Sequence, residues 1–261
     1  TGIEVFNLVP FGENFVRGAY VSGGDLTGDG RAEIAITAER GGGARIRIFS
    51  PNANGVFTQL SDFIGIIGSN GVADFAFRGG ARSAIGDING DGRNDLIFAA
   101  GTGGGPRVAL FNGLTLGLNG GPKLTGDFFV FEPTLRDGSY VAAGDVNGDG
   151  KADLIVGAGN GASRVRVLNG ALLISSNGST VQALNGIDFF AYGTTGGTGV
   201  RVAADDLDGD GKADLITGPG TGQGSTVKVY SATNLLANGA NPATSQQLNL
   251  FGAFQGGLYV G

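Results

Sequence analysis

The chain has 261 residues, of which 41% are apolar, so it can build a buried core and is not disordered throughout. It contains no Cys and no His, which excludes disulfides, thiolate nucleophiles and the Ser-His-Asp and HExxH constellations. The net charge of −6 argues against a nucleic-acid-binding protein, and no apolar stretch of about 18 residues is present that would predict a membrane span.

Four segments of the sequence align without gaps around an acidic loop of nine residues. They read GDLTGDGRAEIAIT, GDINGDGRNDLIFA, GDVNGDGKADLIVG and DDLDGDGKADLITG. The first loop aspartates are separated by 62, 58 and 61 residues and are Asp25, Asp87, Asp145 and Asp206. This spacing predicts tandem repeats, with units at approximately 18–78, 79–136, 137–197 and 198–256.

Each unit predicts the same four short strands in chain order. A leading run such as 140–143 enters the loop, and a short apolar run follows it, as expected for a strand covered on both faces: 34–36, 96–99, 154–156 and 215–216. A Gly-rich turn then leads to a strand of alternating character, with one buried and one wetter face: 45–49, 107–111, 164–168 and 226–230. An aromatic-rich strand, such as 128–131 or 189–192, closes the unit.

Four short antiparallel strands per unit, with no helical period, predict an all-β fold. We expect a single β-propeller domain over 1–261, or part of one, with four-stranded blades of about 60 residues and the acidic loop between the first two strands of each blade. A two-sheet sandwich is the alternative, but it would not predict the same loop once per unit. Residues 257–260 resemble 138–141, and residues 1–24 supply a closing and a leading strand, so we also expect partial strands at both ends.

Oxygen donors recur at positions 1, 3, 5 and 9 of every loop. They are Asp25, Thr27, Asp29 and Glu33; Asp87, Asn89, Asp91 and Asp95; Asp145, Asn147, Asp149 and Asp153; and Asp206, Asp208, Asp210 and Asp214. The seventh residue would add its backbone carbonyl while its cationic side chain points outward; it is Arg31, Arg93, Lys151 or Lys212. Glycine at position 6 permits a sharp bend. Six or seven hard oxygen ligands in a flexible ring suit Ca²⁺ better than Mg²⁺, so we expect four calcium sites.

The alternative is that Asp-Gly and Asn-Gly pairs simply form hairpin turns, which the fourfold recurrence disfavours. The loop is not an EF-hand, because its twelfth position is Ile36, Phe98, Val156 or Thr217 in place of Glu. Loop 1 is the weakest candidate, since its third ligand position is a neutral Thr and its ninth is the longer Glu. The four loops hold 13 of the 23 acidic residues, so the negative charge is mostly a feature of the expected metal sites.

The pattern D-x-[DNT]-x-D-G-x-x-[DE] followed by an apolar strand, and the phrase YVAAGDVNGDG at 140–150, resemble the FG-GAP repeat family. Its best-known members are the calcium-binding β-propellers of integrin α-subunits, and similar units occur in secreted bacterial surface proteins and some propeller lectins. The resemblance covers nearly the whole chain and implies an extracellular or cell-surface protein with calcium in each loop. Integrin-type propellers have seven blades, whereas four loops occur here.

These observations predict a calcium-stabilised extracellular structural or adhesion module, and not an enzyme. Its expected partners are itself, by head-to-tail strand addition at the unfinished ends, or other surface proteins and glycans. The alternative is a carbohydrate-binding propeller, which could use basic residues of the third strands or aromatic residues of the fourth: Arg45, Arg47, Arg107, Arg164, Arg166 and Lys228; Phe129, Phe131, Phe190 and Tyr192. Ion pairing and packing between blades are the favoured uses of these residues. A calcium-dependent hydrolase is least favoured, because nearly every clustered carboxylate is assigned to a metal.

Overall fold

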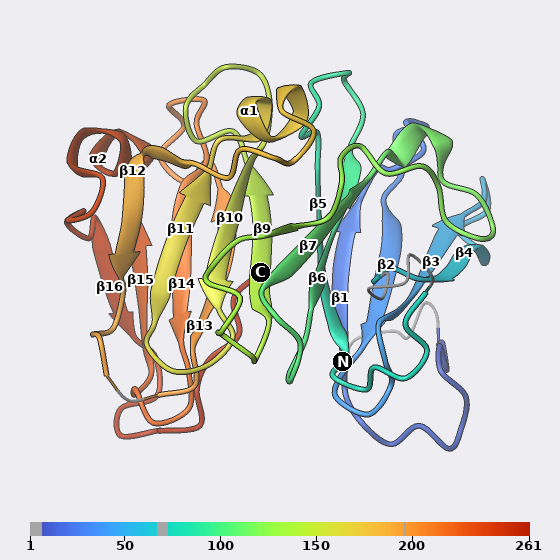
Figure 1. Ribbon diagram of the computed structural model, residues 1–261, viewed down its shortest axis with the longest axis horizontal. Coiled ribbons are helices and arrows are strands. Elements are labelled where there is room, and N and C mark those ends of the chain that lie inside the picture. Colours follow the sequence, from blue (N-terminus) through green and yellow to red (C-terminus); the bar gives the residue numbers. More distant parts are fainter. Residues whose placement is uncertain (1–6, 67–72, 196) are drawn as a thin grey trace.

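The computed structural model describes residues 7–66, 73–195 and 197–261, and its strands form four antiparallel sheets of four strands each (Figure 1). Blade 1 contains β1 (Ala19–Gly24), β2 (Glu33–Ala38), β3 (Arg45–Pro51) and β4 (Phe57–Ile64). Blade 2 contains β5 (Ala81–Gly86), β6 (Asp95–Ala100), β7 (Arg107–Phe111) and β8 (Phe128–Phe129). Blade 3 contains β9 (Ser139–Gly144), β10 (Asp153–Ala158), β11 (Arg164–Leu168) and β12 (Ala183–Phe190). Blade 4 contains β13 (Val200–Asp205), β14 (Asp214–Pro219), β15 (Thr226–Tyr230) and β16 (Gln246–Asn249).

The protein is therefore an all-β, four-bladed β-propeller, and the sandwich alternative is excluded because the strands form four sheets. Each acidic loop joins the first two strands of its blade, as predicted. The first strands pack against one another in sequence, β1 on β5, β5 on β9 and β9 on β13, so they face the middle of the molecule.

Within the described residues, three short helical turns follow third strands, and the sequence did not predict them. They are η1 (Gly113–Thr115), α1 (Gly170–Ser175) and α2 (Ala232–Asn238). The side chains of Asn169 and Ser231 cap α1 and α2 by accepting backbone hydrogen bonds. A capping Asn or Ser shortly before the apolar residues of α1 and α2 was the available sequence signal for these helices. Six or seven residues are too few to show a helical period, so the signal was not sufficient.

The core lies between the blades. One cluster of buried apolar residues joins blades 1 and 2, a second joins blades 2 and 3, and a third joins blades 3 and 4. The second residue of each of the first three loops enters the cluster shared with the next blade and is fully buried: Leu26, Ile88 and Val146. At about 25 cal/mol per Å² of apolar area removed from water, this burial makes the contact between consecutive blades the main stabilising contact of the fold.

Glycine ends the first strand of blades 1 to 3 because the next blade approaches closely there. A Cβ on Gly24 would lie 2.5 Å from Cγ2 of Ile85, and a Cβ on Gly86 would lie 2.6 Å from Cβ of Ala143. Blade 4 has Asp205 at this position, and its side chain is exposed. The one departure from the repeated glycine thus coincides with the blade that has no following blade packed on it in the described structure.

Partial strands were expected at both ends of the chain, but the described end segments contain no regular strand. Residues 7–18 and 250–261 contain no strand, and residues 1–6, where the closing strand was partly expected, lie outside the described residues. Residues 257–260 nevertheless occupy the place of a further first strand: Leu258 N donates to Pro219 O of β14 at 2.9 Å, and a Cβ on Gly218 would meet Leu258 O at 2.8 Å. Gly157 of β10 meets Val200 O of the next first strand in the same way, at 2.3 Å.

Candidate metal-binding loops

Each loop folds around the carboxylate of its first residue. In the third loop, Oδ1 of Asp145 accepts hydrogen bonds from the N–H groups of Gly148 (2.7 Å) and Asp149 (3.1 Å), and Oδ2 accepts one from Gly150 N–H (2.8 Å). The other loops repeat these bonds around Asp25, Asp87 and Asp206. Gly150 has a φ of 85°, which confirms the sharp bend that glycine was expected to permit at position 6.

The ninth residue of each loop carries the buried carboxylate. Asp95, Asp153 and Asp214 are exposed by 0%, 1% and 2%, although a lone buried charge is costly. Oδ2 of Asp153 accepts from Val146 N–H at 3.2 Å, and its Oδ1 accepts from the N–H of Gly170, the first residue of α1, at 3.0 Å. The carboxylate therefore ties the loop to the helical turn after the third strand.

In loop 1 the buried carboxylate belongs to a longer side chain, which finds different hydrogen-bond donors. Blade 1 has no helical turn after β3, and Glu33 instead accepts from Leu26 N–H at 2.7 Å and from the Ser50 hydroxyl at 2.9 Å. The Glu that looked anomalous in the sequence is thus the residue that can reach a more distant donor.

Positions 3 and 5 bring further oxygen atoms to the same place. In loop 4, carboxylate oxygens of Asp206, Asp208 and Asp210 lie within 4.8 Å of one another. In loops 2 and 3, the Asn amide at position 3 contacts the Asp carboxylate at position 5 (3.0 and 3.1 Å), and in loop 1 the Thr27 hydroxyl contacts Glu33 (3.3 Å). A donor set made only of oxygen, with three or four carboxylates per loop, has the chemistry that a divalent cation such as Ca²⁺ needs.

The three buried aspartates at position 9 hold their protons unusually tightly in the protein without metal. Burial raises the pKa of Asp153 to about 7, and the charges of Asp149 and Asp145 add to the rise, against hydrogen bonds from Gly170 and Val146 N–H. Burial likewise raises the pKa of Asp95 to about 6. The pKa of Asp214 is raised for the same reason. Loops 2, 3 and 4 therefore concentrate more negative charge than their own hydrogen bonds stabilise.

The side chains at position 7 were expected to point outward, but three of the four lie against the preceding loop. The Arg93 guanidinium donates to Thr27 O of the preceding loop at 2.6 Å, and Lys151 and Lys212 lie against Gly90 and Gly148 of the loops before them. Only the first of the series, Arg31, turns to its own loop, where it pairs with Asp29 at 3.1 Å. These side chains cover the neighbouring loop because the blades bring consecutive loops side by side.

Backbone hydrogen bonds join the loops in the same order. The eighth residue of one loop donates to the carbonyl oxygen of the first residue of the loop before it: Ala152 N–H to Asp87 O (2.7 Å) and Ala213 N–H to Asp145 O (2.8 Å). The Asn94 side chain makes the corresponding bond to Asp25 O (3.1 Å). The four loops are therefore linked along one rim of the propeller.

The arginines of the third strands form ion pairs with acidic residues of their own or the neighbouring blade. Arg45 and Arg47 share Asp62, Arg107 pairs with Asp127, and Arg164 and Arg166 share Asp188. Lys228 donates to Ala191 O at 2.7 Å. Among the aromatic residues named above, Phe131 is buried between blades and Tyr192 donates to Thr217 O, whereas Phe129 and Phe190 are 45% and 44% exposed.

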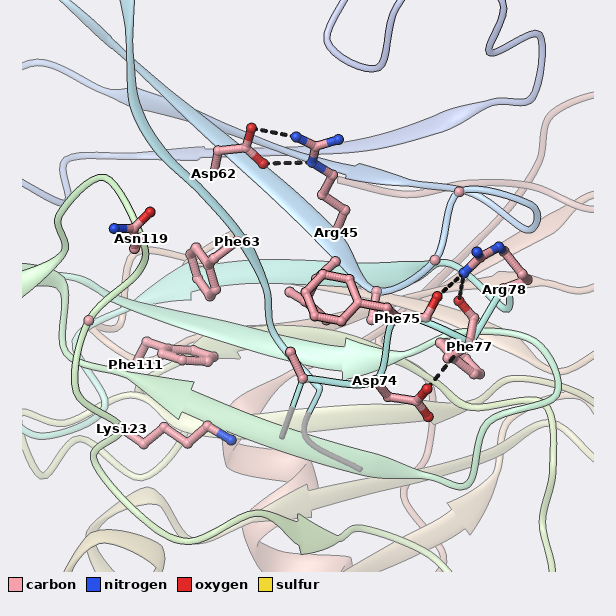
Figure 2. Close-up of a pocket in the computed structure, with 16 residues that line it drawn as sticks. Arg45, Asp62, Phe63, Asp74, Phe75, Phe77, Arg78, Phe111, Asn119 and Lys123 are labelled. Carbon is pink, nitrogen blue, oxygen red and sulfur yellow. Dashed lines mark hydrogen bonds and ion pairs between the residues drawn. The ribbon is translucent and has the colours of Figure 1, made fainter. Parts of the chain in front are cut away.

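A pocket that sequence reasoning missed lies between blades 1 and 2 (Figure 2). The rings of Phe63 and Phe111 pack edge to face in it with centroids 5.1 Å apart, and Phe75, which is 68% exposed, lies beside them. The paired side chains of Arg45 and Asp62 stand at its edge. Of these residues only Arg45 was singled out from the sequence, because no sequence pattern brings residues of two blades together.

Comparison with known proteins places the repeats in context. The model of the FG-GAP-like repeat matches residues 25–98, 87–156 and 145–217. Phosphatidylinositol-glycan-specific phospholipase D of Mus musculus is 32% identical over 144 residues, which are 50% of this chain and 17% of that protein. The same protein of Bos taurus is 32% identical over 171 residues, 57% of this chain and 20% of the relative. The chain thus spans a fifth or less of the length of these curated relatives.

Solved structures with a similar fold include two rhamnogalacturonan lyases. Rhamnogalacturonan lyase YesW superposes on 81% of this chain and 40% of its own, with a TM-score of 0.45 and 16% identity. The Bacillus licheniformis rhamnogalacturonan lyase superposes on 85% of this chain and 41% of its own, with a TM-score of 0.46 and 17% identity. At this level of identity the likeness concerns the fold alone.

The expectation that the chain is not an enzyme is contradicted, since relatives that are 32% identical over about half of this chain are named as phospholipases. The expectation rested on the absence of His and Cys and on the assignment of clustered carboxylates to metal. Those observations exclude particular catalytic groups from the sequence, but they carry no information on whether a propeller belongs to an enzyme.

The raised pKa values predict how the stability of the metal-free protein depends on pH. The folded protein holds protons on Asp95 and Asp153 more tightly than the unfolded chain, whose carboxyl pKa has the ordinary value of 3.8. Their contribution to stability is therefore fully present below about pH 4 and is lost as the pH rises through about 6 to 7. In chelator, we expect Tm to fall by roughly 5 °C across this window, measured by circular dichroism.

Asp153→Asn is the matched variant, because it keeps the side-chain shape and removes one titrating group. Its Tm in chelator should depend less on pH than that of the wild type. A wild-type Tm that rises through the same pH window would contradict this pH dependence.

Proposed function

Because the chain belongs to the FG-GAP-like repeat family, we propose that it is a calcium-stabilised extracellular structural and adhesion module with one Ca²⁺ in each of its four loops. The observation that carries the proposal is the row of four oxygen-rich loops linked along one rim. Since hydrogen bonds connect each loop to the next blade, an ion that orders a loop also strengthens the contact between blades.

The proposed ligands are the residues at positions 1, 3, 5 and 9 and the backbone carbonyl at position 7. Two carboxylates about 4 Å apart repel each other by roughly 4 kcal/mol at an effective dielectric constant of 20, and a bound cation reverses the sign of that interaction. Calcium supplies this charge and takes no part in a reaction in this proposal.

An extracellular location agrees with the calcium requirement. Extracellular calcium modules bind with dissociation constants near 10⁻⁴ to 10⁻³ M, which only the calcium outside cells would saturate. Over the described residues, no helix has the length and apolar character needed to cross a membrane.

The adhesive surface that we propose is the outer face of blade 4, and its partner is blade 1 of a second copy. Leu207 is 52% exposed, whereas its counterparts in the first three loops are fully buried under the next blade. Leu248, Leu250 and Phe251 on and after β16 are also exposed, by 41%, 52% and 62%. Since blades 1 to 3 use this face to bind the following blade, its natural complement is the leading face of another blade 1.

Carbohydrate binding is a second candidate, favoured by the pocket between blades 1 and 2. An exposed aromatic ring in a pocket that is also lined by charged and amide side chains is a typical combination in small-molecule sites, and Phe75, Asn119 and Lys123 supply it from different sides of the pocket (Figure 2).

The calcium proposal predicts about four bound Ca²⁺ per chain in titration calorimetry, and about one fewer for Asp87→Asn. Each occupied site should stabilise the fold by about 1.4 kcal/mol when free calcium is ten times its dissociation constant. Asp205→Asn is the charge-matched control, because Asp205 directly precedes loop 4 and lies outside the ligand positions. A chain that binds no calcium, or an Asp87→Asn variant that keeps full stoichiometry, would refute the assignment.

The adhesion proposal predicts self-association in millimolar calcium, measured by analytical ultracentrifugation. Leu207→Asp should weaken the association about tenfold or more, because a charge would be buried in the contact. Leu114→Asp is the control, since Leu114 is equally exposed, at 56%, and lies on η1 of blade 2. A wild-type protein that stays monomeric at high concentration rules the proposal out.

The carbohydrate alternative predicts binding on a glycan array in calcium that Phe75→Ala abolishes. Phe75 is exposed, so its truncation should leave the fold intact, and Phe254→Ala changes a phenylalanine of 48% exposure outside the pocket. A blank array for the wild type, or equal binding by both variants, counts against the pocket as the sugar site.

A further inference from the structure

One residue of every repeat reaches the axis of the propeller. Tyr20, Arg82, Tyr140 and Arg201 each precede the first aspartate of their loop by five residues, and so share one register on β1, β5, β9 and β13. Tyr259, in the segment that occupies the place of a further first strand, lies beside them. Tyrosine and arginine therefore alternate around a central cavity of about 350 Å³.

The two arginines are buried among the tyrosine rings. Cζ of Arg82 lies 3.9 Å from the ring centroid of Tyr140 and 5.5 Å from that of Tyr20. Cζ of Arg201 lies 4.9 Å from the Tyr140 centroid and 4.8 Å from that of Tyr259. The arginine residues are only 6% and 7% exposed, so both guanidinium charges are removed from water and packed near one shared ring.

Within the described residues, neither arginine has an anionic partner. Nη1 of Arg82 donates to the carbonyl oxygens of Asp137 and Ser139 at 3.4 and 3.3 Å, and Nη1 of Arg201 donates to Thr198 O at 3.3 Å, all long for hydrogen bonds. The buried Nε atom of each arginine has no hydrogen-bond partner. Buried charges in proteins are ordinarily paired, so the cavity holds an uncompensated positive charge.

The cavity lining contains no carboxylate that could supply the missing partner. The acidic residue that contacts the ring from outside this lining is Glu39, which accepts from the Tyr20 hydroxyl at 3.3 Å. Burial acts to raise the pKa of Tyr259, yet hydrogen bonds from Tyr20, Arg201 and Tyr140 and the charge of Arg201 bring that pKa below its ordinary value. Burial, with a smaller contribution from Tyr140, raises the pKa of the neighbouring Tyr20, so negative charge is favoured at Tyr259 alone among these two hydroxyls.

We propose that the central cavity binds an oxyanion, a phosphate or sulfate group, between Arg82 and Arg201. Guanidinium groups offer forked donors that match such oxygens, and tyrosine hydroxyls can donate further bonds. The cavity volume lies at the lower end of the range for small-molecule sites, about 300 to 1000 Å³, so it has room for a group of monosaccharide size attached to the anion. The site is separate from the acidic loops and does not depend on calcium in them.

Tyrosine fluorescence can test this, because the chain has no Trp and three of its five Tyr line the cavity. The full chain in calcium is titrated with sodium sulfate or with glucose 6-phosphate at constant ionic strength. Sodium chloride, a weakly bound anion, is the control for sulfate, and glucose, which is uncharged, is the control for glucose 6-phosphate. We expect a saturable change with the two oxyanions and none with chloride or glucose. Tighter binding of glucose 6-phosphate than of sulfate would indicate that the site binds an oxyanion attached to a larger molecule. Equal binding of the two would indicate that it binds the free inorganic ion.

The variants Arg82→Gln and Arg201→Gln should each weaken oxyanion binding about tenfold or more, because a charge-assisted hydrogen bond is lost. Arg136→Gln removes an exposed arginine elsewhere and should leave it unchanged. Arg201→Lys keeps the positive charge but loses the forked donors, so its oxyanion affinity should lie between those of the wild type and Arg201→Gln. This variant also provides the test if the Gln variants fold poorly. A wild type that responds to no oxyanion, or variants that bind as the wild type does, would overturn the proposal whatever the calcium titrations give.

Discussion

The contact between one blade and the next is the interaction on which the rest of the structure depends. A single four-stranded sheet of about 60 residues cannot bury its apolar faces alone. Here the three core clusters all lie between blades, and each is completed by residues of two repeats. Leu26, Ile88 and Val146 sit in the loops themselves, so the same nine residues that gather oxygen atoms also anchor the following blade.

This double role of the loop explains why each repeat can hold several acidic residues close together. In blades 2 to 4 the carboxylates at position 9 are buried at the junction of strand, loop and helical turn, and they order all three by accepting backbone hydrogen bonds. The raised pKa values of Asp95 and Asp153 show that these bonds do not fully offset the burial of charge. A cation completes the balance in the proposed function, and because neighbouring loops are bonded to each other, its effect would extend along the rim.

The repeat also departs from its own pattern at particular positions. Asp205 replaces the glycine that the close approach of the next blade requires, and Leu207 is exposed where its counterparts are buried. The alternation of Tyr and Arg at one register of the first strands is a second departure, and it concentrates charge and aromatic surface on the axis. The absence of His and Cys did not predict that relatives at 32% identity are named as phospholipases.

The sequence by itself determined the repeat, the strands and the candidate ligands, because these depend on local features: the period of apolar residues, the glycines that permit bends, and oxygen-bearing side chains at fixed spacing. It could not assign the direction of Arg93, the reason for Glu33, the pocket between blades 1 and 2 or the Tyr and Arg ring. Each of these joins residues from different repeats or from distant parts of one. Only the packing of blades around an axis decides which of those residues meet, because that packing depends on all four sheets at once.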